Sequence, residues 1–190
     1  MTCVWVSDDS KTIVAGTAGY TTRESDTLRS HSLYVSYDAG QTFEKLMQPE
    51  NVMIHDSKMN GLVASRYDYD GTYLYVTMNV TGRWNYVVDL GYSCDSGDVI
   101  GGKVLRYYFS DGKIAGYDDI TPDADGTLTA EFLNYGFGGI SSCKTMPGLL
   151  VCSTLCREKE SDEIVYLSKD YGSSWSVSLC GLEKGDLYFN

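Results

Sequence analysis

Closely spaced aspartates are the residues of this 190-residue chain that could carry acid–base chemistry. Two carboxyl groups held about 6.5–9.5 Å apart can act as general acid and general base in an inverting glycosidic hydrolysis. Several of these aspartates stand beside glycine or in Asp-rich turns, where a carboxylate caps backbone N–H groups. We therefore interpret all of them as turn residues and predict no catalytic residue. The pairs are Asp68 and Asp70, Asp95 and Asp98, Asp118 and Asp119, and Asp123 and Asp125.

The segment 79–102, NVTGRWNYVVDLGYSCDSGDVIGG, is the main candidate for a binding site. It is far longer than a hairpin between two strands needs. Long loops on a rigid scaffold commonly carry binding residues. An aromatic ring there can stack on the apolar face of a sugar, or it can pack within its own loop, and the sequence leaves both interpretations open. The candidate substrate-binding residues are Arg83, Trp84, Tyr86 and Tyr92.

An eight-residue motif, Ser-x-Asp-x-Gly-x-(Ser/Thr)-aromatic, occurs twice, at 36–43 (SYDAGQTF) and at 168–175 (SKDYGSSW), with a shorter degenerate copy at 110–112. The spacing predicts a turn between antiparallel strands, in which the aspartate accepts backbone N–H bonds and the glycine adopts positive φ. We expect the final aromatic to begin the next strand and bury its ring. The predicted role is structural, and its residues are Ser36, Asp38, Gly40, Thr42, Phe43, Asp111, Gly112, Ser168, Asp170, Gly172, Ser174 and Trp175.

Short strand-like runs come in three groups of four, separated by turn signals such as Asp70-Gly71 and Pro147-Gly148. The third run of each group ends in Ser and Asp. A repeat of this size, made of four antiparallel strands, is typical of a β-propeller blade. We therefore predict an all-β fold of about three four-stranded blades, an incomplete propeller that forms one partial domain over 1–190. The blades are expected at approximately 1–50, 57–122 and 136–181.

Composition and net charge limit the classes of molecule that this chain is expected to bind. The net charge is −11 and no Lys/Arg cluster stands in the chain, so we predict neither a nucleic acid nor a membrane as partner. Six cysteines are present without a C-x-x-C pair, and the two histidines, His31 and His55, lie far from Cys152 and Cys156, so no metal site is predicted. A disulfide between Cys143 and Cys152 is possible, because they would lie on adjacent strands. Asn79 begins a glycosylation sequon.

The motif resembles the Asp-box of sialidases, sortilin-type receptors and some glycosidases. Its flanks, in chain order, are HSLYVSYDAGQTFEKLMQP, DGTYLYVTMNV, GGKVLRYYFSDGKIAGYDDITP, GFGGISSCKTMPGLLVCSTL and DEIVYLSKDYGSSW. Together they resemble glycoside hydrolase family 74, the xyloglucanases and oligoxyloglucan hydrolases, from about Val4 to about Leu179. LYVT, DITP and FGG in this order between two Asp-boxes is the specific combination.

The resemblance implies a part of the first of two seven-bladed propellers that face each other across a polysaccharide cleft. The family's catalytic pair is one aspartate from each propeller. The Arg-Thr-Asp-x-Gly-Gly segment of its base does not stand in this chain, and the second propeller is absent, so no catalytic residue is carried over. The chain is thus expected to be a portion of a xyloglucan-active inverting hydrolase that contributes scaffold and part of the β-glucan-binding cleft, without a cofactor. The resemblance also implies an extracellular location, although the N-terminus lacks a signal-peptide pattern.

Two rival functions remain. One is a non-catalytic Asp-box module that binds carbohydrate or protein, as sortilin-type domains bind peptides. The other, ranked last, is a sialidase, which needs an arginine cluster for the sialic carboxylate. In every case, three blades of a ring leave two open faces, which predicts that the isolated chain self-associates or is only marginally stable.

Overall fold

The computed structural model describes residues 3–17, 32–49, 52–54, 58–60, 62–81, 99–122, 136–155 and 164–180. These residues form three four-stranded antiparallel sheets and one two-stranded sheet, and they form no helix. Sheet 1 contains β1 (Cys3–Val6), β2 (Ile13–Thr17), β3 (Ser32–Ser36) and β4 (Glu44–Lys45). Sheet 2 contains β7 (Leu62–Tyr69), β8 (Tyr73–Thr81), β9 (Val99–Ser110) and β10 (Lys113–Asp119). Sheet 3 contains β11 (Gly136–Ser142), β12 (Leu150–Leu155), β13 (Ile164–Ser168) and β14 (Ser176–Cys180). The all-β prediction is confirmed.

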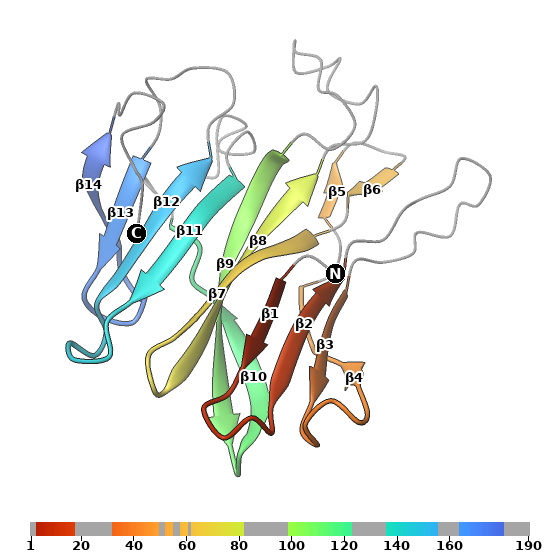
Figure 1. Ribbon diagram of the computed structural model, residues 1–190. Helices are drawn as coiled ribbons and strands as arrows, with labels where there is room; N and C mark the ends of the chain where they lie inside the picture. Colours follow the sequence, from red (N-terminus) through yellow and green to blue (C-terminus); the bar gives the residue numbers. More distant parts are fainter. Residues whose placement is uncertain are drawn as a thin grey trace.

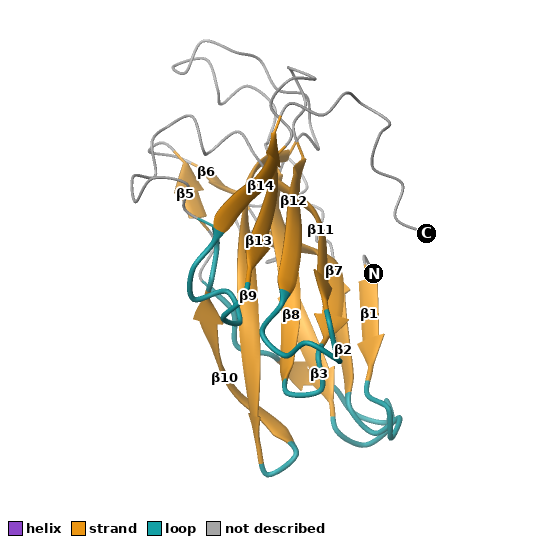
Figure 2. Ribbon diagram, turned by 90° about the vertical axis from the view of Figure 1, so that its left-hand side faces the viewer, coloured by secondary structure: helices purple, strands orange, loops and turns teal. Residues whose placement is uncertain are grey.

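Each large sheet is a simple meander, in which strands adjacent in sequence pair with each other. Sheet 2 lies between the other two (Figure 1). Figure 2 shows that the strands of the three sheets run along a common direction, with the short turns at one end. The small hairpin of β5 (Val52–Ile54) and β6 (Lys58–Asn60) was not predicted from the sequence.

Sheet 2 is apolar on both faces, which explains why its strands do not show a simple apolar–polar alternation. Along β8, Leu74, Val76 and Met78 point toward sheet 1, and Tyr75 points toward sheet 3. All four side chains are at most 1 % exposed. A strand that is covered on both faces reads as a continuous apolar run, because neighbouring residues point to opposite sides.

Sheets 1 and 2 share the first core. From sheet 1 it receives the fully buried Val14 and Leu33, together with Val35. An aromatic group closes this core near β1 and β7: Trp5 lies 5.3 Å from Tyr69, and Tyr69 lies 5.9 Å from Phe109, between ring centroids. The first pair is tilted and the second is edge-to-face, and such ring contacts add to the free energy gained by burying the ring area.

Sheets 2 and 3 share the second core, and a buried amide joins them. Asn79 on β8 accepts a hydrogen bond from the Phe137 N–H (2.7 Å) and donates one to the Phe137 carbonyl (3.2 Å). Asn79 is 6 % exposed and Phe137 is 5 % exposed. Gly102, the β9 partner of Asn79, leaves the space for this contact, since a Cβ there would lie 2.8 Å from the Phe137 ring. The amide nitrogen of the Asn79 sequon is therefore buried and engaged in the folded chain.

The segments that follow the last strands of sheets 1 and 2 make the same two kinds of hydrogen bond to the third strand of their sheet. After β4, the Leu46 N–H donates to the Leu33 carbonyl, and the Gln48 side chain accepts from the Leu33 N–H; both distances are 2.8 Å. After β10, the Ile120 N–H donates to the Val104 carbonyl (2.9 Å), and the Thr121 hydroxyl accepts from the Val104 N–H (3.0 Å). Pro49 and Pro122 come next, and a proline cannot continue the ladder because it has no N–H.

In both segments that follow the last strand of a sheet, an aromatic side chain of the next sheet donates a hydrogen bond to a backbone carbonyl. Tyr107 of sheet 2 donates its hydroxyl to the Met47 carbonyl (2.8 Å). Trp175, just before β14 of sheet 3, donates its indole N–H to the Ile120 carbonyl (2.8 Å). The contact between sheets 1 and 2 and the contact between sheets 2 and 3 are thus two copies of one kind of junction.

Candidate functional site

The strand ends that border the four longest undescribed segments between strands lie at one end of the three sheets. Antiparallel pairing brings the ends of strands that border 18–31, 82–98, 123–135 and 156–163 to the same side of the three sheets, opposite the short turns (Figure 1). The candidate binding residues Arg83, Trp84, Tyr86 and Tyr92 all belong to 82–98, which lies outside the described residues. The structure therefore shows where this loop leaves sheet 2 and does not place its side chains.

The two Asp-box turns have the same geometry, residue for residue. In the first, Asp38 accepts hydrogen bonds from the Ser36 hydroxyl (2.7 Å) and from the Thr42 N–H (2.9 Å) and hydroxyl (2.6 Å). In the second, Asp170 accepts from the Ser168 hydroxyl and the Ser174 N–H (2.8 Å each), and from the Ser174 hydroxyl. The Ser36 and Ser168 hydroxyls accept the N–H of Gly40 and Gly172, respectively, at 2.8 Å. Both oxygens of each carboxylate thus accept hydrogen bonds from residues of the same turn.

Two consecutive residues in each turn have positive φ, whereas the sequence predicted only the glycine. The values are 58° at Ala39 and 86° at Gly40, and 61° at Tyr171 and 85° at Gly172. The residue before the glycine is held in this conformation by its N–H, which donates across to the neighbouring hairpin: Ala39 to the Lys11 carbonyl and Tyr171 to the Gly148 carbonyl, both at 3.0 Å. A left-handed Ala or Tyr gives no signal in the sequence, because its cost is offset by tertiary hydrogen bonds.

These contacts make the first turn sensitive to pH. Hydrogen bonds from Thr42 and Ser36 hold the pKa of Asp38 at about 2, below its ordinary value of 3.8. A carboxyl group whose folded pKa is depressed contributes stability above its ordinary pKa and loses that contribution as pH falls toward the folded pKa. We expect Asp38→Asn to lower the melting temperature at pH 7, and the difference from wild type to shrink between about pH 4 and about pH 2. Thermal unfolding followed by circular dichroism across this range measures the difference.

Asp111→Asn is the control for this pH series. Its carboxylate lies 3.5 Å from the Ser110 hydroxyl and does not bridge its turn as Asp38 does. A constant difference between Asp38→Asn and wild type from pH 7 to pH 2 would contradict the prediction.

The third copy of the motif folds differently. Asp111 (φ 52°) and Gly112 (φ 74°) are the two central residues of a tight hairpin between β9 and β10, in which Ser110 pairs with Lys113. Two residues with positive φ are typical of a type I′ turn, for which Asp-Gly is a preferred sequence. This copy is one residue shorter than the other two, so its turn is too short to form the wider loop of the Asp-box.

The final aromatic of the motif is partly buried in one copy and exposed in the other. Trp175 packs against the second core and bonds to Ile120. Phe43, at the equivalent position, is 48 % exposed, so the prediction that it buries its ring is wrong. The physical reason is the neighbour: sheet 2 lies against the face that carries Trp175, and no such sheet lies against the face that carries Phe43 among the residues that the structure describes.

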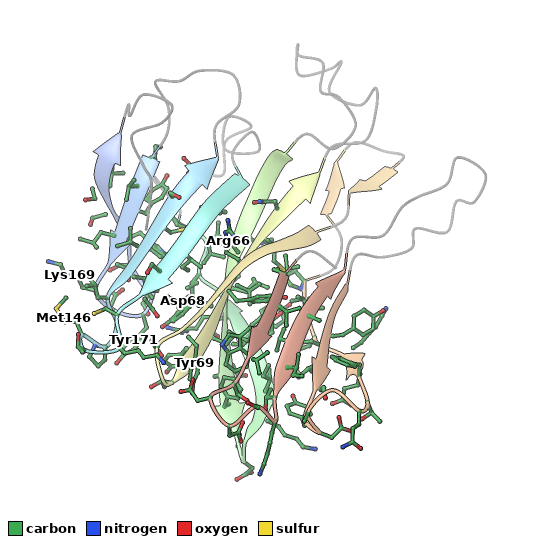
Figure 3. All side chains as sticks on the ribbon, in the orientation of Figure 1. Arg66, Asp68, Tyr69, Met146, Lys169 and Tyr171 are labelled. Atoms are coloured by element: carbon green, nitrogen blue, oxygen red, sulfur yellow. The ribbon has the colours of Figure 1, made fainter. Side chains whose placement is uncertain are left out.

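The described aspartates of the candidate pairs all have structural partners. Asp70 caps the N–H groups of Thr72 and Tyr73 (2.8 Å each) and accepts the buried Tyr75 hydroxyl (2.7 Å). Asp68 accepts the Ser142 N–H and so ties β7 to β11 (Figure 3). These two carboxylates hold turns and neighbouring sheets in place.

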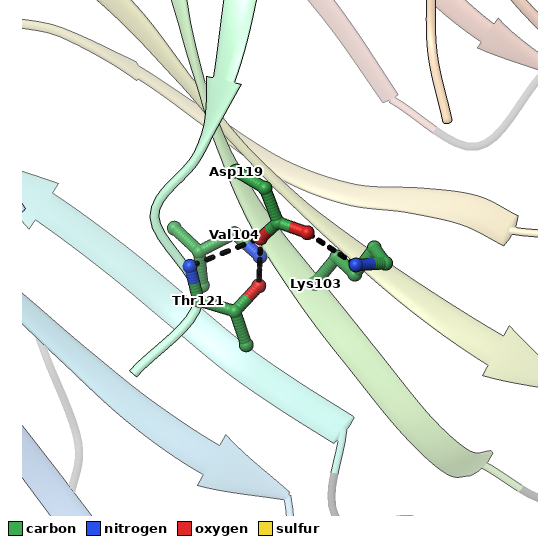
Figure 4. A network of polar contacts seen from close by, with 4 residues as sticks. All are labelled: Lys103, Val104, Asp119 and Thr121. Atoms are coloured by element: carbon green, nitrogen blue, oxygen red, sulfur yellow. Dashed lines mark hydrogen bonds and ion pairs between the residues drawn. The ribbon is translucent and has the colours of Figure 1, made fainter. Parts of the chain in front are cut away.

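The adjacent pair on β10 is engaged by basic side chains. Asp118 accepts two hydrogen bonds from the Arg106 guanidinium, at 3.2 Å and 2.7 Å. Asp119 accepts hydrogen bonds from the Lys103 ammonium and the Thr121 hydroxyl (Figure 4). Burial of Asp119 raises its pKa, but these bonds outweigh that effect and the pKa is lowered. A general acid needs a raised carboxyl pKa, whereas hydrogen bonds lower the carboxyl pKa of Asp9, Asp38, Asp119 and Asp170. Asp95, Asp98, Asp123 and Asp125 lie outside the described residues.

Cys143 and Cys152 are thiols, so the disulfide between them is not formed. Cys152 pairs with Ile140 across β11 and β12 and is fully buried, whereas Cys143 lies beyond the end of β11. Within the described ranges, no group of three or more His, Cys, Asp or Glu residues is placed to hold a metal ion. No helix of these residues has the length and apolar character needed to cross a membrane.

No protein-family model matches the chain, and no curated protein matches its sequence. The resemblance to family 74 therefore stays a prediction from the quoted motifs.

Proposed function

We propose that the three sheets are consecutive blades of an incomplete β-propeller that binds a β-glucan chain, of the xyloglucan type, at the end with the long connections. The observation that carries the proposal is the common location of those connections. Rigid sheets with saturated turns at one end and long loops at the other are the usual arrangement of a binding scaffold. The loop 82–98 supplies Arg83 and the aromatic residues Trp84, Tyr86 and Tyr92.

In this proposal the chain contributes scaffold and part of the cleft of an inverting glycoside hydrolase, without a catalytic pair of its own. The engagement of Asp68, Asp70, Asp118 and Asp119 by structural partners supports this, since a catalytic carboxylate must stay available to substrate and water. The sugar would be held by ring stacking and by hydroxyl contacts rather than by charge.

Binding is tested by affinity electrophoresis of the chain in gels with and without xyloglucan. We expect the polysaccharide to retard the chain, and Trp84→Ala to weaken binding by about tenfold, the effect of losing one stacked ring. Tyr108→Ala is the matched control, because Tyr108 is 39 % exposed and lies near the short turn that joins β9 and β10. Equal mobility with and without xyloglucan would contradict the proposal.

A reducing-end assay on xyloglucan tests the second half of the proposal. We expect no turnover by the chain alone. Release of reducing ends that tracks the purified chain would show a catalytic pair outside the described residues and would contradict the scaffold role.

A further inference from the structure

The outer face of sheet 1 is the exposed counterpart of a face that is buried in sheet 3. Strand register gives the correspondence: Tyr34 pairs with Ala15, as Tyr166 pairs with Cys152. By the same registers, Val4 corresponds to Ile140 and Ile13 corresponds to Leu150. Phe43 corresponds to Trp175 as the final aromatic of the Asp-box.

Position by position, the sheet 1 face is the more exposed of the two. The buried Leu150, Cys152 and Tyr166 have the half-buried equivalents Ile13, Ala15 and Tyr34, and the half-buried Ile140 and Trp175 have the exposed equivalents Val4 and Phe43. In sheet 3, Leu150 and Cys152 are fully buried and Tyr166 is 2 % exposed, because sheet 2 covers them. In sheet 1, Val4 is 42 % exposed, Val6 is 46 % exposed and Phe43 is 48 % exposed. Clustered, exposed apolar side chains on one sheet face mark an interaction surface.

Sheet 3 carries the complementary face. Val151 and Leu167 point away from sheet 2, because their strand neighbours Cys152 and Tyr166 point toward it. Val165 shares this face and is already covered, at 5 % exposure, so Val151 and Leu167 would make most of the contact. Their sheet 1 equivalents, Val14, Leu33 and Val35, are buried against sheet 2.

The two outer faces are therefore the two halves of the junction that the chain already forms twice. In each junction, one sheet presents the face equivalent to Val14, Leu33 and Val35, and the next presents the face equivalent to Tyr166 and Trp175. Sheet 3 offers the first half and sheet 1 offers the second. A single chain cannot bring them together while sheet 2 separates them.

We infer that a second copy of this chain fills both faces, with sheet 3 of each copy docked on sheet 1 of the other. Two copies joined in this reciprocal way form a closed pair with a two-fold axis, in which six sheets surround the axis and neither apolar face stays exposed. The inference depends on the repeated junction and does not need the proposed function.

Sedimentation velocity and multi-angle light scattering of the chain at micromolar concentration test it. We expect two chains per particle. Val4→Lys and Leu167→Lys should each raise the dimer dissociation constant about a hundredfold or more, because each variant places an unpaired charge in both junctions of the pair. Met146→Lys is the control: Met146 is 55 % exposed in the turn after β11, at the short-turn end of sheet 3 (Figure 3), and this variant should stay dimeric.

Mixing the two interface variants gives the sharpest test. The Val4→Lys chain keeps an intact sheet 3 face, and the Leu167→Lys chain keeps an intact sheet 1 face, so an equimolar mixture restores one junction and should form a heterodimer. Far-UV circular dichroism of each variant checks that the sheets are intact. A monomeric wild-type chain, open-ended assembly, or a Leu167→Lys chain that dimerises as wild type does would each overturn the inference.

Discussion

Replacing Asn79 by alanine is expected to lower the free energy of unfolding by about 2–4 kcal/mol. The side chain satisfies both the N–H and the carbonyl of Phe137 in a site where Asn79 is 6 % exposed. Alanine removes both partners, and the space between β8 and the start of β11 is too closed for water to replace them freely. Asn79→Asp keeps the acceptor but loses the donor and buries a charge beside a carbonyl, so it should be at least as destabilising. Urea unfolding of the chain at one fixed protein concentration measures the change.

Gln41→Ala is the control for Asn79, because it truncates an amide side chain that is exposed in the first Asp-box turn. It should change the free energy of unfolding by about 0.5 kcal/mol or less. If Asn79→Ala unfolds at the same urea concentration as Gln41→Ala, the amide does not hold sheets 2 and 3 together.

The strands and turns could be predicted from the sequence because their signals are local. Asp70-Gly71, Asp111-Gly112 and the two Asp-boxes each contain the residues that their backbone conformation requires, whatever surrounds them. The grouping into three sheets came from the repeat. The roles of Asp70 and Asp170 as turn residues came from the neighbouring glycines.

The features that could not be predicted depend on contacts with a different strand, turn or sheet, distant in the sequence. Phe43 and Trp175 occupy the same place in the same motif, but sheet 2 lies beside Trp175 alone, so Trp175 is partly buried whereas Phe43 is exposed. Asn79 is an ordinary strand residue in the sequence, since its partner Phe137 is 58 positions away. The positive φ at Tyr171 likewise depends on a carbonyl from another hairpin. Long-range contacts of this kind leave no periodic or compositional signal.

The largest loss of stability is expected from Tyr107→Ala, at about 3–5 kcal/mol. The Tyr107 side chain is fully buried between sheets 1 and 2, its ring lies 5.6 Å from that of Tyr117, and its hydroxyl donates to the Met47 carbonyl. Alanine leaves a cavity in the first core and also removes the hydrogen bond that holds the Met47 carbonyl after β4. Tyr107→Phe removes the hydroxyl alone and should cost about 1–2 kcal/mol, so the pair of variants separates the packing of the ring from the hydrogen bond.

Tyr108→Ala is the matched control for Tyr107→Ala, since it truncates the next residue of the same strand, on the opposite side. Tyr108 is 39 % exposed, and its ring lies over Gly116 of β10 rather than in either core. Its loss should cost about 1 kcal/mol, measured by the same urea titration. Tyr107 joins sheets 1 and 2, whereas Tyr108 joins two strands of sheet 2. If Tyr108→Ala lowers the free energy of unfolding more than Tyr107→Ala does, strand pairing within sheet 2 limits the stability of the chain, and the junction with sheet 1 does not.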